Sequence, residues 1–238
     1  MNYKRLKRYA SALGRLRKSK GFGIHSPFAF RFVLRVLKER LPYYGYDTID
    51  RAYTDARTLI ARQGIKHPGI IAPKYAKMIF RIVNHFNPAE ILQIGTNYGI
   101  STTSALTPSS RSRLWIYGIR QRQFDTFKAV TAPLAARINT YTDAHTAIDA
   151  YRAAASEPFV VINDVDAEAL ASLSERLTEF LADRCVIIMT AIAHKQQSEE
   201  LWNEVKSNIR GGMTFSNGRF GVVVCNPKLP VQHFSLWF

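Results

Sequence analysis

The chain has 238 residues, 47% of them hydrophobic, which is enough for one α/β domain with an appendage and a sizeable core. No apolar run approaches the roughly 18 residues that a membrane-spanning helix needs, and no apolar region follows the basic start as it would in a secretory signal. Cys185 and Cys225 lie inside apolar runs and are expected to be reduced core residues. These features predict a soluble, cytoplasmic protein.

The formal charge of +15 is concentrated in the first part of the chain. Residues 1–90 carry 19 Lys and Arg against 5 Asp and Glu, whereas residues 91–238 carry 14 against 13. Residues 1–20 hold eight basic residues and no acid, with large apolar residues at helical spacing, which predicts a basic amphipathic helix. Three interpretations remain open: its apolar stripe packs on the protein body, its basic face contacts nucleic-acid phosphates, or it lies on an anionic membrane surface.

More helices are expected after this basic segment. Ser26-Pro27 is typical of an N-cap followed by the first residue of a helix, here one that ends before Pro42. Helices are also predicted over about 48–63 and over 74–86, with a loop rich in Gly and Pro between them. We therefore expect residues 1–86 to form a basic helical N-terminal extension.

His25, Tyr43 and Tyr44 belong to this extension and have two interpretations. They form a lid over a ligand, because a His beside glycines and paired aromatic rings offer an adaptable, polar-tipped surface. Alternatively, the tyrosines fasten the N-terminal helices onto the rest of the protein.

From residue 89 onward, strand and helix patterns alternate, which is typical of βαβ units in a parallel sheet. Asn217-Gly218 then separates two apolar runs and predicts a β-hairpin. The sequence thus predicts an α/β fold: a doubly wound, Rossmann-like, seven-stranded sheet with a terminal antiparallel hairpin. The expected strands are 90–94, 114–118, 138–141, 159–163, 185–190, 213–216 and 220–225, and the expected helices are 99–106, 121–130, 144–155, 167–182 and 196–209.

The segment from Glu90 to Ser101 carries the strongest functional pattern. A short apolar run leads into Gly95 and Gly99, and a helix-compatible sequence follows. Such a strand, glycine loop and helix can present backbone N–H groups to a ligand. The dinucleotide fingerprint and the P-loop are both absent, and an ordinary turn that binds nothing is the alternative.

The run from Gln93 to Ser101, QIGTNYGIS, resembles the first motif of the class I S-adenosylmethionine-dependent methyltransferases, E-I-G-T-x-x-G-x-S/T. It departs from that motif at the leading acid, which is Gln93. The resemblance implies that the loop binds S-adenosylmethionine and that residues 87–238 form a Rossmann-like methyltransferase domain. The cofactor-binding residues that it implies are Gly95, Thr96, Asn97, Tyr98, Gly99, Ile100 and Ser101.

The resemblance covers nearly the whole chain. A bacterial family of predicted class I methyltransferases has a basic N-terminal extension, and its further features are similar to Gly21–Phe28, Tyr43-Tyr44 and Gln232–Phe234. It implies that Gly118, after strand two, and Asn163, after strand four, line the adenosine side. This chain departs from the family at both positions, because the family has acids there.

Thr190 and Ala191 occupy the place of the acids that hold Mg²⁺ in catechol-type relatives, so we expect no metal site. Asp164 is a candidate catalytic or binding residue and, alternatively, a helix cap. Asp166 is expected to cap the helix that starts near Ala167. His194 is a candidate general base after strand five.

The function that these observations favour is methyl transfer to the oxygen or nitrogen of a small-molecule acceptor, with S-adenosylmethionine as cofactor. Two alternatives remain open. The loss of acids favours a methyltransferase-like protein that binds or scaffolds without catalysis. The basic segment over residues 1–20 favours a protein that binds or modifies RNA.

Overall fold

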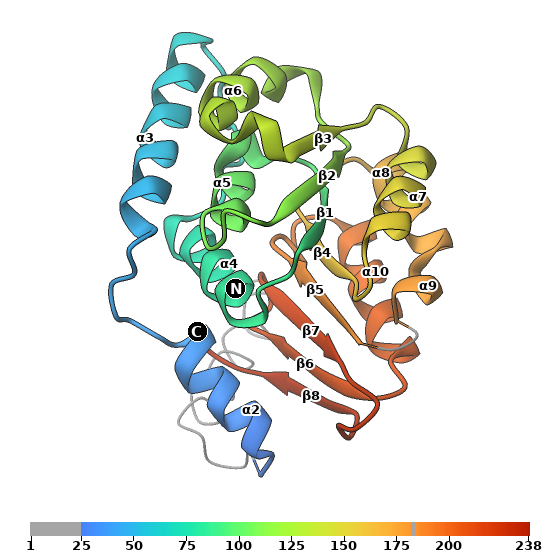
Figure 1. Cartoon of the computed structure of the whole chain (residues 1–238). Coiled ribbons are helices and arrows are strands. Elements are labelled where there is room, and N and C mark those ends of the chain that lie inside the picture. The colour runs from blue at the N-terminus through green and yellow to red at the C-terminus, as the bar shows by residue number, and fades with distance from the viewer. Residues whose placement is uncertain (1–24, 182–183) are drawn as a thin grey trace, which may run out of the picture.

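The computed structural model describes residues 25–181 and 184–238, so the basic helix predicted over residues 1–20 lies outside the described residues. The described chain folds into one mixed sheet of eight strands with helices on both faces (Figure 1). Among these residues, no helix is both long enough and apolar enough to cross a bilayer.

The sheet has the strand order β3-β2-β1-β4-β5-β7-β6-β8. The first five strands along the chain are mutually parallel, β7 runs antiparallel to both β5 and β6, and β8 is parallel to β6. The strands are β1 (Glu90–Ile94), β2 (Arg113–Tyr117), β3 (Ile138–Thr140), β4 (Phe159–Ile162), β5 (Cys185–Met189), β6 (Gly212–Ser216), β7 (Gly221–Cys225) and β8 (Gln232–Ser235).

The helices divide between the two faces of the sheet (Figure 1). One face is covered by α2 (Pro27–Phe32) and its π-helical continuation η1 (Val33–Leu37), α3 (Tyr46–Arg62), α4 (Pro73–Phe86), α5 (Ile100–Leu106) and α6 (Gln121–Thr131). The other face is covered by α7 (Ala144–Ala154), α8 (Ala167–Glu175), α9 (Leu177–Leu181) and α10 (Gln196–Asn208). Two 3₁₀ turns, η2 (Asn97–Gly99) and η3 (Ala132–Arg137), complete the order.

Two hydrophobic cores result, one on each face of the sheet. Side chains alternate between the faces along a strand, so Val186 and Ile188 of β5 join the core under α4, whereas Ile187 and Met189 join the core under α10. Because both faces are covered, the central strands are continuous apolar runs rather than alternating ones.

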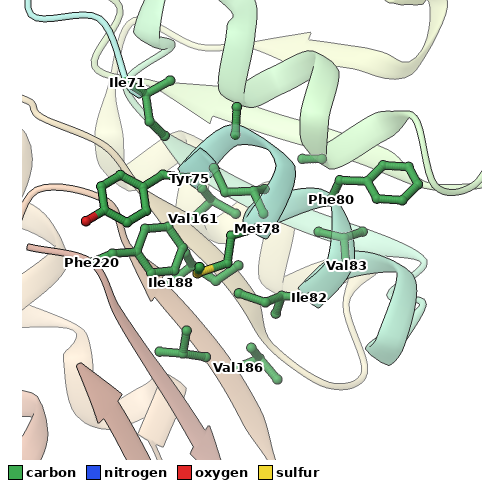
Figure 2. Close-up of a cluster of buried hydrophobic side chains, with 14 of the residues drawn as sticks. Ile71, Tyr75, Met78, Phe80, Ile82, Val83, Val161, Val186, Ile188 and Phe220 are labelled. Carbon is green, nitrogen blue, oxygen red and sulfur yellow. The ribbon is translucent and has the colours of Figure 1, made fainter. Parts of the chain in front are cut away.

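The helix α4 is the main element of the first core. Figure 2 shows its side chains above β4, β5 and β7, with Met78 and Ile82 beside Val186 and Ile188. The ring of Tyr75 stacks on Phe220 with 5.1 Å between the ring centroids. This packing fixes α4 on the sheet. The opposite side of the helix contacts η1.

The sheet contains one strand more than the seven that the sequence predicts. The additional strand β8 pairs with β6, and its Phe234 stacks on Phe215 with 5.2 Å between centroids. The prediction was wrong here because β8 has four residues and a single large apolar side chain, too few for a readable strand pattern.

The helix predicted over 167–182 is also interrupted. Arg176 has φ −108° and ψ 10°, outside helical values, and separates α8 from α9. Its guanidinium donates to Asp149 of α7 at 2.5 Å and to Glu179 at 2.9 Å. The pair with Asp149 is a tertiary contact and the pair with Glu179 is local. Neither can be predicted from the spacing of apolar residues, which suggested one continuous helix.

Other local predictions are confirmed. The side chain of Ser26 caps α2 by accepting a hydrogen bond from the backbone N–H of Ala29, and Pro27 is the first helical residue. The hairpin around Asn217 joins β6 and β7, and Cys185 and Cys225 are buried, free cysteines. The division of the chain at residue 86 stays a prediction.

Gly212 offers a test of the edge of this sheet. Its φ is +126°, and a Cβ there would collide with the carbonyl oxygen of Val224 and lie 2.8 Å from the Cα of Cys225. We expect Gly212→Ala to lower the free energy of unfolding by about 3 kcal/mol or more, because strain and a backbone clash add together. Urea denaturation measures this loss.

Gly64→Ala is the matched control, because Gly64 also has a positive φ, +67°, but no atom within 4 Å of the added Cβ. It should lose only about 1 kcal/mol, from the strained φ alone. Equal losses in the two variants would contradict the steric role of Gly212.

Candidate functional site

The candidate site lies at the carboxyl ends of the parallel strands. The strand order reverses between β1 and β4, because the chain adds β2 and β3 on one side of β1 and then β4 and β5 on the other. Ligands of open α/β sheets bind at such a switch point. We use the word crevice for the end of the sheet that is bordered by the loops that follow β1, β2, β4 and β5.

The loop after β1 has a strained backbone. Gly95 has φ +72° and Gly99 φ +90°, and Asn97 and Tyr98 also have positive φ values of 47° and 58°. Positive φ is costly for residues other than glycine, so the surrounding structure must hold this turn in place. The whole loop, from Gly95 to Ile100, is buried.

Packing explains both glycines. A Cβ on Gly95 would collide with a methyl group of Val165, which follows β4, and a Cβ on Gly99 would lie 3.0–3.1 Å from Val130 and Thr131 of α6. Val165 is 1% exposed, and its side chain covers the side of Gly95 where a Cβ would project.

The polar side chains of the loop bond inside the protein. Gln93 Nε2 donates to Gly95 O at 2.8 Å and to Thr102 Oγ1 at 2.8 Å, and Ser101 Oγ donates to Thr96 O at 3.0 Å. Thr96 Oγ1 donates to Gln123 of α6 at 2.8 Å. These bonds hold the turn from within rather than aim the side chains at the crevice.

The segment before α4 adds a further contact to this loop. Asn97 Oδ1 accepts a hydrogen bond of 2.9 Å from the backbone N–H of Ile71, which is itself 6% exposed. The predicted loop over 64–73 thus lies against the glycine loop.

Gly118 and Asn163, the two residues expected on the adenosine side, both lie beside Gly95. A Cβ on Gly118 would stand 3.3 Å from Cβ of Ala169 and 3.6 Å from the backbone nitrogen of Gly95. Asn163 Nδ2 donates to Gly95 O at 2.9 Å and to Ile94 O at 3.3 Å, and its Oδ1 accepts from Thr190 at 3.4 Å. Asn163 is therefore engaged with the protein backbone.

Asp164 is the centre of an ion cluster over the crevice. Its carboxylate lies 2.9 Å from His194 Nδ1, 3.1 Å from Lys195 Nζ and 3.6 Å from the Arg120 guanidinium. The Asp164 side chain is 15% exposed and that of His194 is 59% exposed. The structure thus brings together the two residues proposed as catalytic from the sequence.

Asp166 departs from its predicted role. It stands at the N-cap position of α8, but its side chain makes no capping hydrogen bond. It pairs instead with Arg120, at 3.0 Å. The expectation of a cap was wrong because a cation from the loop after β2 competes for the carboxylate.

Sequence reasoning missed Lys195 and Val165, and it considered Arg120 only as a residue that could compensate for the missing acid at Gly118. Lys195 Nζ also donates to Val165 O at 2.7 Å and so fastens the loop that covers Gly95. A basic residue after strand two and another after strand five were visible in the sequence, but only the fold shows that they share one carboxylate.

His25, Tyr43 and Tyr44 do not gather at the crevice. The rings of Tyr43 and Tyr44 each lie 5.6 Å from that of Phe80 in α4, and Tyr44 OH donates to Pro108 O at 2.7 Å, in the loop that precedes β2. These contacts favour the interpretation that the tyrosines fasten the N-terminal helices. His25 is exposed.

Solved structures resemble this fold closely enough to identify it. An O-methyltransferase from Bacillus cereus in complex with S-adenosylhomocysteine has 17% identity and a TM-score of 0.56, over 80% of this chain and 94% of that one. An S-adenosylhomocysteine-bound methyltransferase from Podospora anserina has 10% identity and a TM-score of 0.56, over 84% and 95% of the two chains. The chain has the class I methyltransferase fold.

A third structure of this methyltransferase fold, an O-methyltransferase from Streptomyces achromogenes in complex with S-adenosylmethionine, has 11% identity and a TM-score of 0.55, over 78% and 91% of the chains. No protein-family model matches the chain. No curated protein sequence matches it either.

The position of Gln93 in this methyltransferase fold can be tested by restoring the acid of the resembled motif. In Gln93→Glu, the new carboxylate would face Gly95 O without an N–H to donate, so we expect about 2 kcal/mol less stability at neutral pH. Burial raises the pKa of such a carboxyl in the folded state. Stability is therefore lost as pH rises above the unfolded value of about 4.3 and is regained on acidification.

Urea denaturation at several pH values measures this loss. Gln121→Glu, on the exposed first turn of α6, is the control and should show no such loss. A Gln93→Glu protein as stable as the parent at neutral pH would contradict the hydrogen-bond assignment.

The ion cluster gives a second test. Asp164→Asn leaves Arg120 and Lys195 without their shared carboxylate, and we expect a loss of about 2 kcal/mol in the free energy of unfolding. Asp166→Asn removes a carboxylate that is 67% exposed, and should cost less than about 0.5 kcal/mol. Chemical denaturation at low salt compares the two, and similar losses would show that Asp164 does not organise the cluster.

Proposed function

We propose that the protein is an S-adenosylmethionine-dependent methyltransferase that acts on a small molecule. The observation that carries this proposal is the strained glycine loop at the switch point of a methyltransferase fold. Three solved structures with this fold hold S-adenosylmethionine or S-adenosylhomocysteine.

The charges around the crevice fit this cofactor. Arg120 and Lys195 can attract its carboxylate, and Asp164 can attract its ammonium and sulfonium groups. The backbone of the loop from Gly95 to Gly99 would hold the methionine end. Val165 must turn away from Gly95 for the cofactor to approach the loop, because its methyl group now covers that glycine.

Methyl transfer asks little chemistry of the protein, since the sulfonium of the cofactor already activates the methyl group and in-line positioning of the acceptor supplies much of the rate. The chain's own contribution would be a proton acceptor. The Nδ1–H of His194 can donate a hydrogen bond to Asp164 Oδ2, which leaves the unprotonated Nε2 of the exposed ring free to take a proton from an acceptor hydroxyl. Asp164 would then orient the base rather than react itself.

Calorimetric titration with S-adenosylhomocysteine tests the proposal directly. We expect saturable binding to the intact chain, with a dissociation constant in the micromolar range. Arg120→Ala should weaken binding by about tenfold, because it removes a charge-assisted contact worth about 1.5 kcal/mol. Arg111→Ala, an exposed residue in the loop before β2, is the matched control and should bind as the parent does.

The position of the Val165 side chain over Gly95 leads to a separate prediction. Val165→Ala should bind S-adenosylhomocysteine more tightly than the parent, because less side chain must leave Gly95. It should also unfold at lower urea concentration, since it leaves a cavity costing about 2 kcal/mol. If neither the parent nor Val165→Ala binds while both are folded by circular dichroism, the methyltransferase proposal is wrong, and the chain is a non-catalytic member of the fold.

A further inference from the structure

A cavity lies on the outer side of α4, away from the sheet. It is a groove of about 930 Å³ between the end of η1, the start of α3, α4 and the last residues of the chain. Tyr75 and Ile79 of α4 pack toward the sheet, whereas Lys74, Lys77 and Arg81 lie on the opposite side of the helix and line the groove. Figure 2 shows the sheet-facing side of the same helix. The groove shares no residue with the crevice.

The lining is strongly basic. Five of its residues are cationic and one is acidic: Lys38, Arg40, Lys74, Lys77 and Arg81 against Glu39. The carboxylate of Glu39 accepts from the backbone N–H groups of Leu41 at 2.8 Å and Arg40 at 2.6 Å, and these bonds, together with the charge of Arg81, lower its pKa. Glu39 therefore caps its own turn. Asp50 lies 2.8 Å from Lys77, and Lys74 Nζ donates to Phe238 O at 3.5 Å.

Arg81 places a buried positive charge in the wall of this groove. It is 8% exposed, and its guanidinium donates to Val36 O at 2.6 Å, to Leu37 O at 3.1 Å and to Tyr46 OH at 2.9 Å. All three acceptors are neutral, and within the described residues no carboxylate lies within 4.0 Å of the guanidinium. The charge of Glu39 acts on Arg81 only from beyond that distance, so the guanidinium keeps a positive charge in the wall that little solvent screens and that can attract an anion.

Aromatic side chains form the other part of the lining. Tyr46, Trp237 and Phe238 border the groove, together with Met78 and Pro42. Trp237 is 52% exposed, whereas Trp115 and Trp202 are 7% and 5% exposed. An exposed indole beside a cationic wall can cover the flat face of a ligand ring.

We propose that this groove binds a small organic phosphate that carries an aromatic ring, independently of the methyltransferase proposal. The phosphate would lie against Arg40, Lys74 and the field of Arg81, and the ring against Trp237.

Phenyl phosphate is the probe, with the full chain and the emission of Trp237 as the readout. Because the other two tryptophans are buried, a saturable change in emission on titration reports this groove, and calorimetry supplies a second measurement. Phenol and inorganic phosphate separate the two parts of the ligand. We expect each to bind at least about tenfold more weakly than phenyl phosphate, and the affinity for phenyl phosphate to fall as salt is added.

Arg40→Ala/Lys74→Ala removes two exposed charges from the groove and should weaken phenyl phosphate binding by about tenfold or more. Arg111→Ala/Lys228→Ala removes two exposed charges elsewhere and should bind as the parent does. Equal weakening in both double variants, or no saturable binding to the intact chain at millimolar probe, would overturn the proposal. Inorganic phosphate binding as tightly as phenyl phosphate would overturn the role of Trp237.

Discussion

The carbonyl oxygen of Gly95 receives two side-chain N–H groups, one from Gln93 at 2.8 Å and one from Asn163 at 2.9 Å. The Gln93 bond holds the loop against its own strand, and the Asn163 bond ties the end of β1 to the end of β4, the two strands between which the order of the sheet reverses. Gln93 also bonds into the first turn of α5, and Asn163 to Thr190 after β5. These bonds therefore link the loops after β1, β4 and β5 around one backbone oxygen.

The same constraint explains how the chain departs from the motif that it resembles. An acid at Gln93 or Asn163 would place a carboxylate against the Gly95 carbonyl, whereas an amide donates to it. The negative charge of the crevice is instead carried by Asp164 and Asp166, one and three residues beyond Asn163, and three cationic or ionisable partners surround Asp164. Compared with the motif that the chain resembles, the negative charges stand in the loops rather than at the strand ends.

The helix α4 has two sides of different character. One side of it is apolar and forms the first core with β4, β5 and β7, as Figure 2 shows. Its other side is basic and holds the N-terminal segment through Arg81, whose bonds to Val36 and Leu37 satisfy carbonyls at the end of η1. A helix that is fixed by its core side can present charges on its outer side without losing its position.

The sequence by itself determined the elements whose signals are local. Apolar runs separated by glycines and helical periodicity predicted the parallel strands and most helices, and Ser26-Pro27 and Asn217-Gly218 marked a helix start and a hairpin through their own backbone preferences. The fold class followed from the alternation of these elements, although β8 was too short to be recognised.

Only the tertiary structure decided which side chains meet. Arg120, Asp164 and Lys195 stand after three different strands, and nothing in their spacing shows that one carboxylate serves both cations. The cover of Val165 over Gly95 and the groove beside Arg81 likewise join residues far apart in the chain. Local patterns predict local structure because their causes lie within a few residues, whereas the chemistry of a site depends on distances that only the packed chain sets.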